Sequence, residues 1–241
     1  MRSLSIEDAE TLEPGDDHYR AYVGPPGRFG LLTQLQLGLL FALGLEETDT
    51  VLDFGCGSLR LGRSLIPYLR PGCYFGLDPN LWLIDDGLAH ETGEAIRAVK
   101  QPRFSGDANF DCTVFDTRFD FIMAQSVITH AGPAQTAALI ESASKSLKQD
   151  GVLALSYIRG EESTPLPGAD WTYPQNVAYP PAWLEETARQ HGLVWRDISW
   201  FHPGAQWALL VRDETRLPDD ATLGLLGRPT PRWRAGQSAT S

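Results

Sequence analysis

A glycine-rich turn that follows an apolar run is the first feature of this chain that could do chemistry. Residues 51–57 read Val-Leu-Asp-Phe-Gly-Cys-Gly, the pattern of a strand that ends where the backbone can approach a ligand closely. A second apolar run, residues 74–77, ends in Asp78, and a carboxylate at that place is typical of a residue that holds ribose hydroxyls. Together they predict a nucleoside-binding crevice, although Asp78 alone is also a common helix N-cap.

The same residues narrow the kind of nucleoside. A dinucleotide fingerprint would have a third glycine at position 60, where this chain has Arg60, and a phosphate-binding P-loop would need Gly-Lys-Ser/Thr, which the chain lacks. A nucleoside without phosphates therefore fits the turn better than a pyrophosphate ligand.

The elements that must position these residues alternate between strand-like and helix-like segments. We expect strands at residues 50–54, 74–78, 104–107, 119–124, 152–157, 193–200 and 206–211, and helices at 31–43, 59–69, 82–99, 133–147 and 181–191. Such alternation predicts a Rossmann-like, doubly wound α/β sheet of seven mostly parallel strands with helices on both faces. The last two strands are too close in sequence for a crossover helix, so we expect an antiparallel hairpin there.

The composition of the chain and the positions of its proline and glycine residues suggest three parts. We expect an N-terminal extension or cap segment at residues 1–29, a main domain at 30–212 with a lid-like insertion at 159–180, and a flexible C-terminal tail at 213–241. The insertion is rich in proline, glycine and aromatic residues and has no sustained periodicity.

Charge and cysteine content exclude several classes of protein. The 241 residues carry 31 acidic and 20 basic side chains, a formal charge of −11, which disfavours nucleic acid as a partner. Three unpaired-looking cysteines do not suggest a disulfide framework or zinc cluster. Neither a signal-peptide pattern nor a bilayer-spanning run is apparent, so we expect a cytoplasmic protein with no membrane partner; its oligomeric state is left open.

The chain resembles the class I S-adenosylmethionine-dependent methyltransferases over residues 45–212. The resemblance is based on residues 53–57 as motif I, Asp78 at the end of the second strand, the Gly-Asp pair at 106–107, residues 119–122 and 150–153, and the closing hairpin. The antiparallel last strand separates this family from the dehydrogenases. One departure is Leu59, where many members carry a third glycine.

The resemblance implies S-adenosylmethionine as cofactor and assigns roles by position. Asp53 would organise the loop and the methionine amino group, and Asp78 would accept from both ribose hydroxyls. Gln125 and Ser126 would lie beneath the sulfonium. The full set of implied cofactor-binding residues is Asp53, Gly55, Cys56, Gly57, Asp78, Pro79, Asn80, Asp107, Asn109, Phe110, Gln125 and Ser126.

His130 is the candidate catalytic residue. It follows the fourth expected strand, where the methyl acceptor would lie, and an imidazole can remove a proton near neutral pH. It could equally cap the helix that begins at Pro133 or order its loop. Residues expected to bind the acceptor are Tyr22, Arg159, Glu161, Trp171 and Tyr173, although loop aromatics can also serve stability alone.

Two hypotheses follow. The first is a metal-independent methyltransferase acting on a small molecule, such as a sugar or secondary metabolite, with oxygen favoured as the acceptor atom. No metal is expected, because Gln125 and Ser126 stand where a metal-dependent subgroup would carry carboxylates. The second is a catalytically silent S-adenosylmethionine-binding protein with a regulatory or scaffold role.

Overall fold

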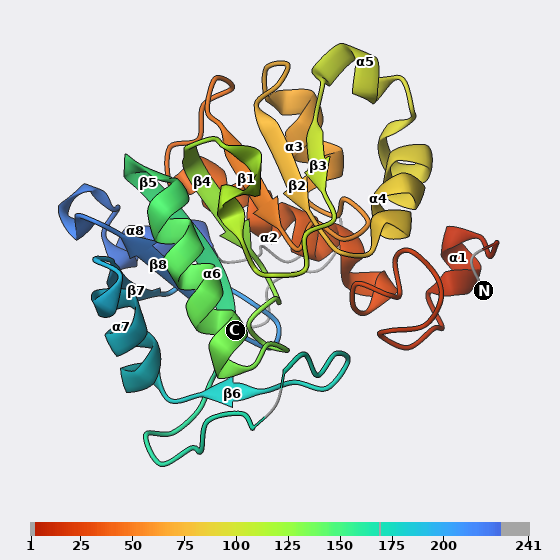
Figure 1. Cartoon of the computed structure of the whole chain (residues 1–241). Coiled ribbons are helices and arrows are strands. Elements are labelled where there is room, and N and C mark those ends of the chain that lie inside the picture. Colours follow the sequence, from red (N-terminus) through yellow and green to blue (C-terminus); the bar gives the residue numbers. More distant parts are fainter. Residues whose placement is uncertain (1–2, 169, 228–241) are drawn as a thin grey trace, which may run out of the picture.

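The chain folds around one central sheet with helices on both sides (Figure 1). The computed structural model describes residues 3–168 and 170–227. The strands are β1 (Val51–Phe54), β2 (Tyr74–Leu77), β3 (Arg103–Ser105), β4 (Phe119–Ala124), β5 (Leu147–Arg159), β6 (Ala178–Tyr179), β7 (Val194–Ile198) and β8 (Gln206–Val211). The α-helices are α1 (Ile6–Ala9), α2 (Phe29–Ala42), α3 (Gly62–Tyr68), α4 (Leu81–Gly87), α5 (Ile96–Lys100), α6 (Pro133–Ser146), α7 (Pro181–Gln190) and α8 (Asp220–Leu226).

The order of the strands confirms the predicted Rossmann-like sheet. It runs β3-β2-β1-β4-β5-β8-β7, with the short β6 paired to the end of β5 off this path. The pairings among β1 to β5 are parallel, whereas β8 runs antiparallel to both β5 and β7. The seven predicted strands and the closing antiparallel hairpin are therefore all present, and the two-residue β6 is an addition.

Both faces of the sheet are buried, because successive strand residues point to opposite sides. In β1, Leu52 joins the core cluster that includes α6 and α7, whereas Val51 joins the cluster that includes α2, α3 and α4. The same alternation holds in β8, where Ala208 packs on the first side and Trp207 on the second. Near-continuous apolar strands are what a sheet covered on both faces requires.

Three predicted elements differ from the observed ones. The helix expected at 59–69 begins only at Gly62, because residues 59–61 continue the turn and Leu59 has a positive φ of 60°. The helix expected at 82–99 is broken into α4, a π-helical turn (Leu88–Thr92) and α5, with Gly93 at φ 80° between them. β5 continues two residues beyond its expected end, to Arg159.

One buried carboxylate, that of Glu91, fastens the middle of the N-terminal segment, defined here as residues 3–28, to the rest of the domain. Glu91 accepts hydrogen bonds from the hydroxyl of Tyr19 at 3.0 Å, from Arg20 Nε at 2.7 Å and from Arg63 at 2.9 Å. Its side chain is only 4% exposed. Charge-assisted bonds of this kind are the stronger ones in proteins, so Glu91 fixes where the segment lies.

The insertion, defined here as residues 160–177, is held mainly through backbone atoms. The amide of Val177 donates to the carbonyl of Thr129 at 2.8 Å, and the amide of Thr172 donates to the carbonyl of His130 at 2.8 Å. These bonds fasten it to the loop between β4 and α6. Figure 1 shows this part of the chain crossing below the sheet toward β6.

The remaining features concern the surface and the C-terminal part. Residues 214–216 and 220–226 form short helices, and Leu223 of α8 is buried against the sheet. The expected tail beyond residue 227 lies outside the described residues.

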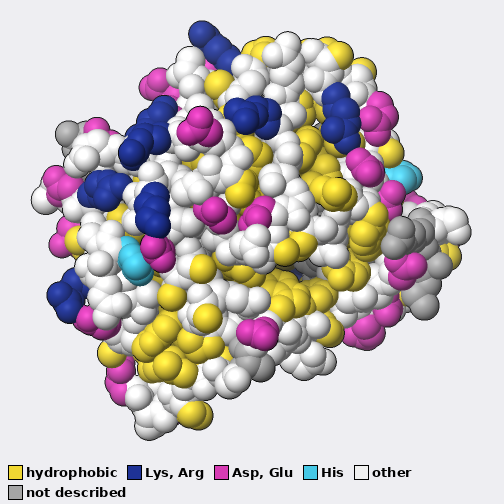
Figure 2. Space-filling view, in the orientation of Figure 1, with side chains coloured by type: hydrophobic (Ala, Val, Ile, Leu, Met, Phe, Trp, Pro, Cys, Tyr) yellow, Lys and Arg dark blue, Asp and Glu magenta, His cyan; other side chains and the backbone are white. Residues whose placement is uncertain are grey.

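Figure 2 shows acidic and basic side chains interspersed over one face, with apolar side chains gathered in its lower half. No helix in the described part of the chain is long and apolar enough to cross a membrane.

Candidate active site

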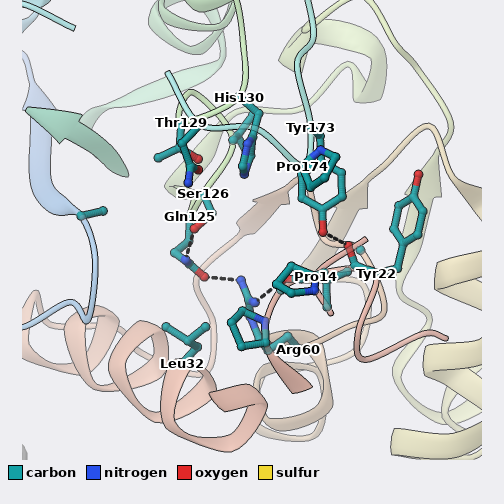
Figure 3. Close-up of a pocket in the computed structure, with 18 of the residues that line it drawn as sticks. Pro14, Tyr22, Leu32, Arg60, Gln125, Ser126, Thr129, His130, Tyr173 and Pro174 are labelled. Carbon is teal, nitrogen blue, oxygen red and sulfur yellow. Dashed lines mark hydrogen bonds between the residues drawn. The ribbon is translucent and has the colours of Figure 1, made fainter. Parts of the chain in front are cut away.

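A cavity of about 340 Å³ lies at the carboxyl ends of the central strands. Ligands of open α/β sheets bind at this edge, and the size is at the lower end for small-molecule sites. It is closed on one side by the N-terminal segment and on the other by the insertion (Figure 3). Residues that line it include Pro14, Tyr22, Val23, Arg28, Leu32, Gly55, Gly57, Arg60, Asp78, Asn80, Gln125, Ser126, Thr129, His130, Ile158, Trp171, Tyr173, Asn176 and His202.

The glycine turn after β1 forms one wall of this cavity. Gly55 and Gly57 have positive φ angles of 72° and 49°, which glycine adopts without a steric cost. A Cβ on Gly55 would stand 2.7 Å from Val127, and one on Gly57 would stand 2.6 Å from Val23. Leu59, which departs from the family pattern, also adopts a positive φ of 60°, so a left-handed residue is kept at the position of the missing glycine.

Asp78 is a buried carboxylate that belongs to the turn as well as to the cavity. Its Oδ2 accepts from the amide of Gly57 at 3.0 Å, and its Oδ1 accepts from the amide of Asn80 at 2.8 Å. Burial raises its pKa, although these hydrogen bonds oppose the rise. The N-cap of α4 is Asn80, so the alternative in which Asp78 is the N-cap is wrong. The carboxylate is thus oriented beside the glycine turn, as a ribose-binding residue must be.

Asp53 lies beneath the turn and does not line the cavity. It is 3% exposed, and the hydroxyl of Tyr74 donates to its Oδ2 at 2.8 Å. Burial raises the pKa of Asp53 to about 7, and the hydrogen bond from Tyr74 opposes that rise. The side chain therefore bonds to β2 below the turn, and its expected role toward the loop and the methionine amino group stays a prediction.

Gln125 and Ser126, at the end of β4, form the floor of the cavity. The Gln125 side-chain oxygen accepts from the guanidinium of Arg60, and its Nε2 lies 3.1 Å from His202 Nε2. Ser126 has a positive φ of 58°, and its amide donates to the hydroxyl of Ser156 at 2.8 Å. A strained residue at the end of a central strand is typical of a functional site.

His130 is oriented by the insertion. Its Nδ1 lies 2.8 Å from the carbonyl oxygen of Gln175, an oxygen that can only accept, so Nδ1 carries the proton and donates. Nε2 of the neutral ring is then the basic nitrogen. Burial lowers the pKa of His130 from its usual value, and the hydrogen bond to Gln175 opposes the change. The residue therefore lines the cavity as a neutral imidazole with its free lone pair on Nε2.

Aromatic rings form the outer wall next to His130. The ring of Tyr173 lies 4.8 Å from that of His130, and the ring of Trp171 lies 5.7 Å from it. The hydroxyl of Tyr173 donates to the backbone carbonyl of Tyr22, so the insertion and the N-terminal segment meet over the cavity (Figure 3). The predicted acceptor residues Tyr22, Trp171 and Tyr173 are thus brought together with His130.

Five other predicted cofactor residues do not line the cavity. The side chain of Cys56 is buried in the core below the turn, and Pro79 is exposed. Asp107 accepts from the amide of Asn109 at 2.8 Å in a turn after β3, and Phe110 packs 5.8 Å from the ring of Phe54. Their predicted contact with the cofactor, including the adenine end, stays a prediction.

Arg159 and Glu161 also lie away from the cavity. β5 continues through both residues 158 and 159, so Ile158 faces the cavity and Arg159 points to the other side of the sheet. There Arg159 forms an ion pair with Asp197 of β7. Glu161 is exposed beyond the strand and is absent from the lining. Neither residue lines the cavity, and their expected contact with the acceptor stays a prediction.

Several lining residues were not predicted from the sequence. Arg60 served in the sequence to exclude a dinucleotide fingerprint and was given no place in the site, and neither were Arg28, Thr129, Asn176 and His202. Arg60 could have been found from the sequence, because it is a charged residue in an otherwise apolar segment that directly follows a ligand-binding turn, and charged residues are unusual in such segments. The others come from distant loops whose meeting no local pattern predicts.

The chemistry of the side chains limits what the site can hold. No group of three or more His, Cys, Asp or Glu side chains able to hold a metal ion is found among the described residues. The glycine turn and Asp78 fit the ribose and methionine parts of S-adenosylmethionine, because they place close backbone and a buried carboxylate at adjacent strand ends. His130 and the aromatic wall lie beyond these parts, where they could contact a second molecule.

Comparisons with known proteins agree with this geometry. Residues 52–153 match a family described as a methyltransferase domain. No curated protein sequence matches the chain. Among solved structures, magnesium protoporphyrin IX methyltransferase from Synechocystis PCC 6803 with bound S-adenosylmethionine is similar, with a TM-score of 0.58, 16% identity, and 78% of this chain and 81% of that chain covered.

Two further structures show the same fold. A TehB-like S-adenosylmethionine-dependent methyltransferase from Corynebacterium glutamicum has a TM-score of 0.52 and 19% identity, covering 74% of this chain and 88% of that chain. The glycopeptide N-methyltransferase MtfA with S-adenosylmethionine has a TM-score of 0.55 and 14% identity, covering 74% and 94%. Residues 52–153 of this chain are therefore a methyltransferase domain, and the fold around them is the one shared by the similar S-adenosylmethionine-dependent methyltransferases.

Proposed function

We propose that this methyltransferase transfers the methyl group of S-adenosylmethionine to a hydroxyl oxygen of a small molecule, with His130 as general base. The observation that supports this most is the orientation of His130. Its Nδ1 is bonded to the Gln175 carbonyl, which leaves Nε2 unprotonated at the cavity wall. A base held in one tautomer beside the cavity is what an acceptor with a removable proton needs.

The transfer is an in-line displacement. The acceptor oxygen forms a bond to the methyl carbon as the carbon–sulfur bond breaks, and the electron pair of that bond stays on sulfur. The hydroxyl proton passes to Nε2 of His130, and the products are the methyl ether and S-adenosylhomocysteine. The protein contributes by aligning the two molecules and by excluding water, which the N-terminal segment and the insertion do from opposite sides.

The small size of the acceptor is supported by charge and by the closed cavity. A formal charge of −11 disfavours nucleic acid, and two segments already meet over the site. The similar structures are named for porphyrin and glycopeptide methylation, so the fold itself is compatible with different acceptors. For this chain a sugar or secondary metabolite with a free hydroxyl fits the aromatic wall of Trp171 and Tyr173.

The experiment has a binding arm and a catalytic arm. Calorimetry with S-adenosylhomocysteine establishes cofactor binding, and a panel of hydroxylated metabolites is screened for a mass gain of one methyl group. With an acceptor in hand, His130→Ala should lower kcat/KM by about 10²–10⁴-fold while cofactor affinity is retained. His191→Ala is the matched control, since His191 ends α7 and does not line the cavity.

The pH profile separates a base from a merely structural residue. Because burial lowers the pKa of His130, the acid limb of kcat/KM should lie below pH 6.5 and vanish in His130→Ala. A variant that stays within a few-fold of the wild type, with the limb unchanged, would refute the base. A wild-type protein that binds no S-adenosylhomocysteine would refute the proposed function as a whole.

A further inference from the structure

The part of the cavity beyond the ribose carboxylate is cationic. The two guanidinium groups of Arg28 and Arg60 line it, and Asp78 is the one acidic side chain among the described residues of the lining. This local excess runs against the chain as a whole, which has a formal charge of −11. A concentration of positive charge in a hollow of an acidic protein points to an anionic ligand.

Arg60 is a buried cation whose hydrogen bonds are incomplete. The residue is 9% exposed, one terminal nitrogen donates to the carbonyl of Val23 at 2.8 Å, and the other donates to Gln125. Its Nε is buried and has no partner among the described residues. None of these hydrogen-bond partners is a carboxylate. Asp53 attracts the guanidinium from beneath the turn, but burial raises the pKa of Asp53 to about 7, so it is only a partial counter-ion and a ligand that carries negative charge would stabilise Arg60 further.

Arg28 adds a second guanidinium at the exposed side of the cavity. It comes from the turn before α2, and its side chain makes no hydrogen bond or ion pair with other described residues. Burial lowers the pKa of His202, and together with the charges of Arg60 and Arg28 it brings that pKa to about 4. Both guanidinium groups therefore act on the same small region around His202.

The cofactor does not neutralise this charge. S-adenosylmethionine carries a sulfonium and an ammonium against a single carboxylate, so it is itself a net cation. Its ribose would be held by Asp78, which is also the only acid in the lining among described residues. A cavity loaded with cofactor thus still contains more positive than negative charge. The acceptor is then the molecule that can supply the missing negative charge.

We propose that the methyl acceptor carries a carboxylate, which Arg28 and Arg60 bind while its ring packs on Trp171 and Tyr173. The inference rests on the proposed function and adds the class of substrate, a hydroxylated ring acid. A guanidinium matches a carboxylate in a planar, two-bonded geometry, which a neutral amide or ester cannot reproduce. The acid group then orients the hydroxyl toward His130.

The test measures acceptor binding to the complex with S-adenosylhomocysteine. The probes are hydroxybenzoic, hydroxycinnamic and uronic acids, each paired with its primary amide. At least one acid should bind about tenfold or more tightly than its amide, as expected for charge-assisted bonds. Arg28→Gln should remove that preference and leave the affinity for S-adenosylhomocysteine within threefold, because Arg28 is exposed and holds no other part of the fold.

Arg70→Gln is the matched control, because it removes the same charge from an exposed arginine that pairs with Glu47 and does not line the cavity. It should keep the preference for the acid. The inference is overturned if no acid binds more tightly than its amide. It is also overturned if Arg28→Gln weakens S-adenosylhomocysteine more than tenfold without changing acid binding, since the arginines would then serve the methionine carboxylate. Failure of the proposed function is distinguishable, because there the wild type binds no S-adenosylhomocysteine at all.

Discussion

Replacing Glu91 with glutamine should release the N-terminal segment from the domain without unfolding the sheet. Glu91 holds Tyr19, Arg20 and Arg63 together, and its carboxylate is 4% exposed, whereas the two arginine side chains are 15% and 27% exposed. Removing one member of a buried ion pair costs about 3–5 kcal/mol, and partial exposure of the arginines brings the expected value to about 3 kcal/mol. That free energy raises the open population of the segment about 100-fold.

Hydrogen exchange followed by mass spectrometry measures this opening directly. The amide of Tyr22 donates to the carbonyl of His18 at 2.8 Å, and the amide of Gly24 donates to that of Ala21 at 3.2 Å. In Glu91→Gln both amides should exchange about 100-fold faster, whereas amides of β1 and β4 keep their protection. Affinity for S-adenosylhomocysteine should fall in parallel, since residues 22–25 line the cavity.

The matched control is Glu94→Gln. The exposed carboxylate of Glu94 pairs with Arg97 at 3.4 Å, and its removal should change the free energy of opening by less than about 0.5 kcal/mol. If Tyr22 exchanges less than threefold faster in Glu91→Gln, the anchoring role is refuted. If the strands lose protection equally, the effect is global and the local reasoning fails.

The wild type should show a matching pH dependence. Burial alone would raise the pKa of Glu91, but hydrogen bonds from Arg63 and Arg20 outweigh it and hold the pKa below its usual value. The stabilisation is therefore complete above the unfolded pKa of about 4.3 and is lost as pH falls through the lower folded value. Protection of Tyr22 should decline in that acid range in the wild type and not in Glu91→Gln.

Three further predictions concern the cofactor side of the cavity. Asp78→Asn replaces an acceptor of two backbone amides and should weaken S-adenosylhomocysteine about 10–100-fold in equilibrium dialysis; a change under threefold would contradict its role. Gly57→Ala should lower stability by about 2–3 kcal/mol in urea unfolding, because its Cβ would stand 2.6 Å from Val23, and Val23→Ala should restore part of the loss; no restoration would exclude that clash. Burial raises the pKa of Asp53 to about 7, so cofactor-free wild type should lose stability as pH rises from about 4 to 7, and Asp53→Asn should not; parallel curves would refute the shift.

The fold was largely predictable because its signals are local and repeated. Apolar runs separated by helical patterns predict a parallel sheet, and the short gap between residues 200 and 206 leaves only an antiparallel hairpin. The glycines at 55 and 57 and the carboxylate of Asp78 fall at strand ends, where such sheets bind ligands. Chain direction and strand order alone bring these residues together.

The acceptor side was less predictable because it depends on register and on distant loops. Ending β5 two residues early in the prediction placed Arg159 in the pocket, whereas the strand continues and Ile158 faces the cavity instead. One residue of register turns a side chain to the other face. Arg28 and His202 come from opposite ends of the chain, so their meeting depends on tertiary packing that no local pattern encodes.

The atoms that hold the insertion in place differ from the side chains that it presents to the cavity. The carbonyl of Gln175 orients His130, and the amides of Thr172 and Val177 hold the neighbouring loop, so these contacts use main-chain atoms of the insertion. Main-chain donors and acceptors survive substitution of almost any side chain. Substitutions at Trp171 and Asn176 can therefore reshape the wall of the cavity while the main-chain contacts that orient the imidazole stay in place.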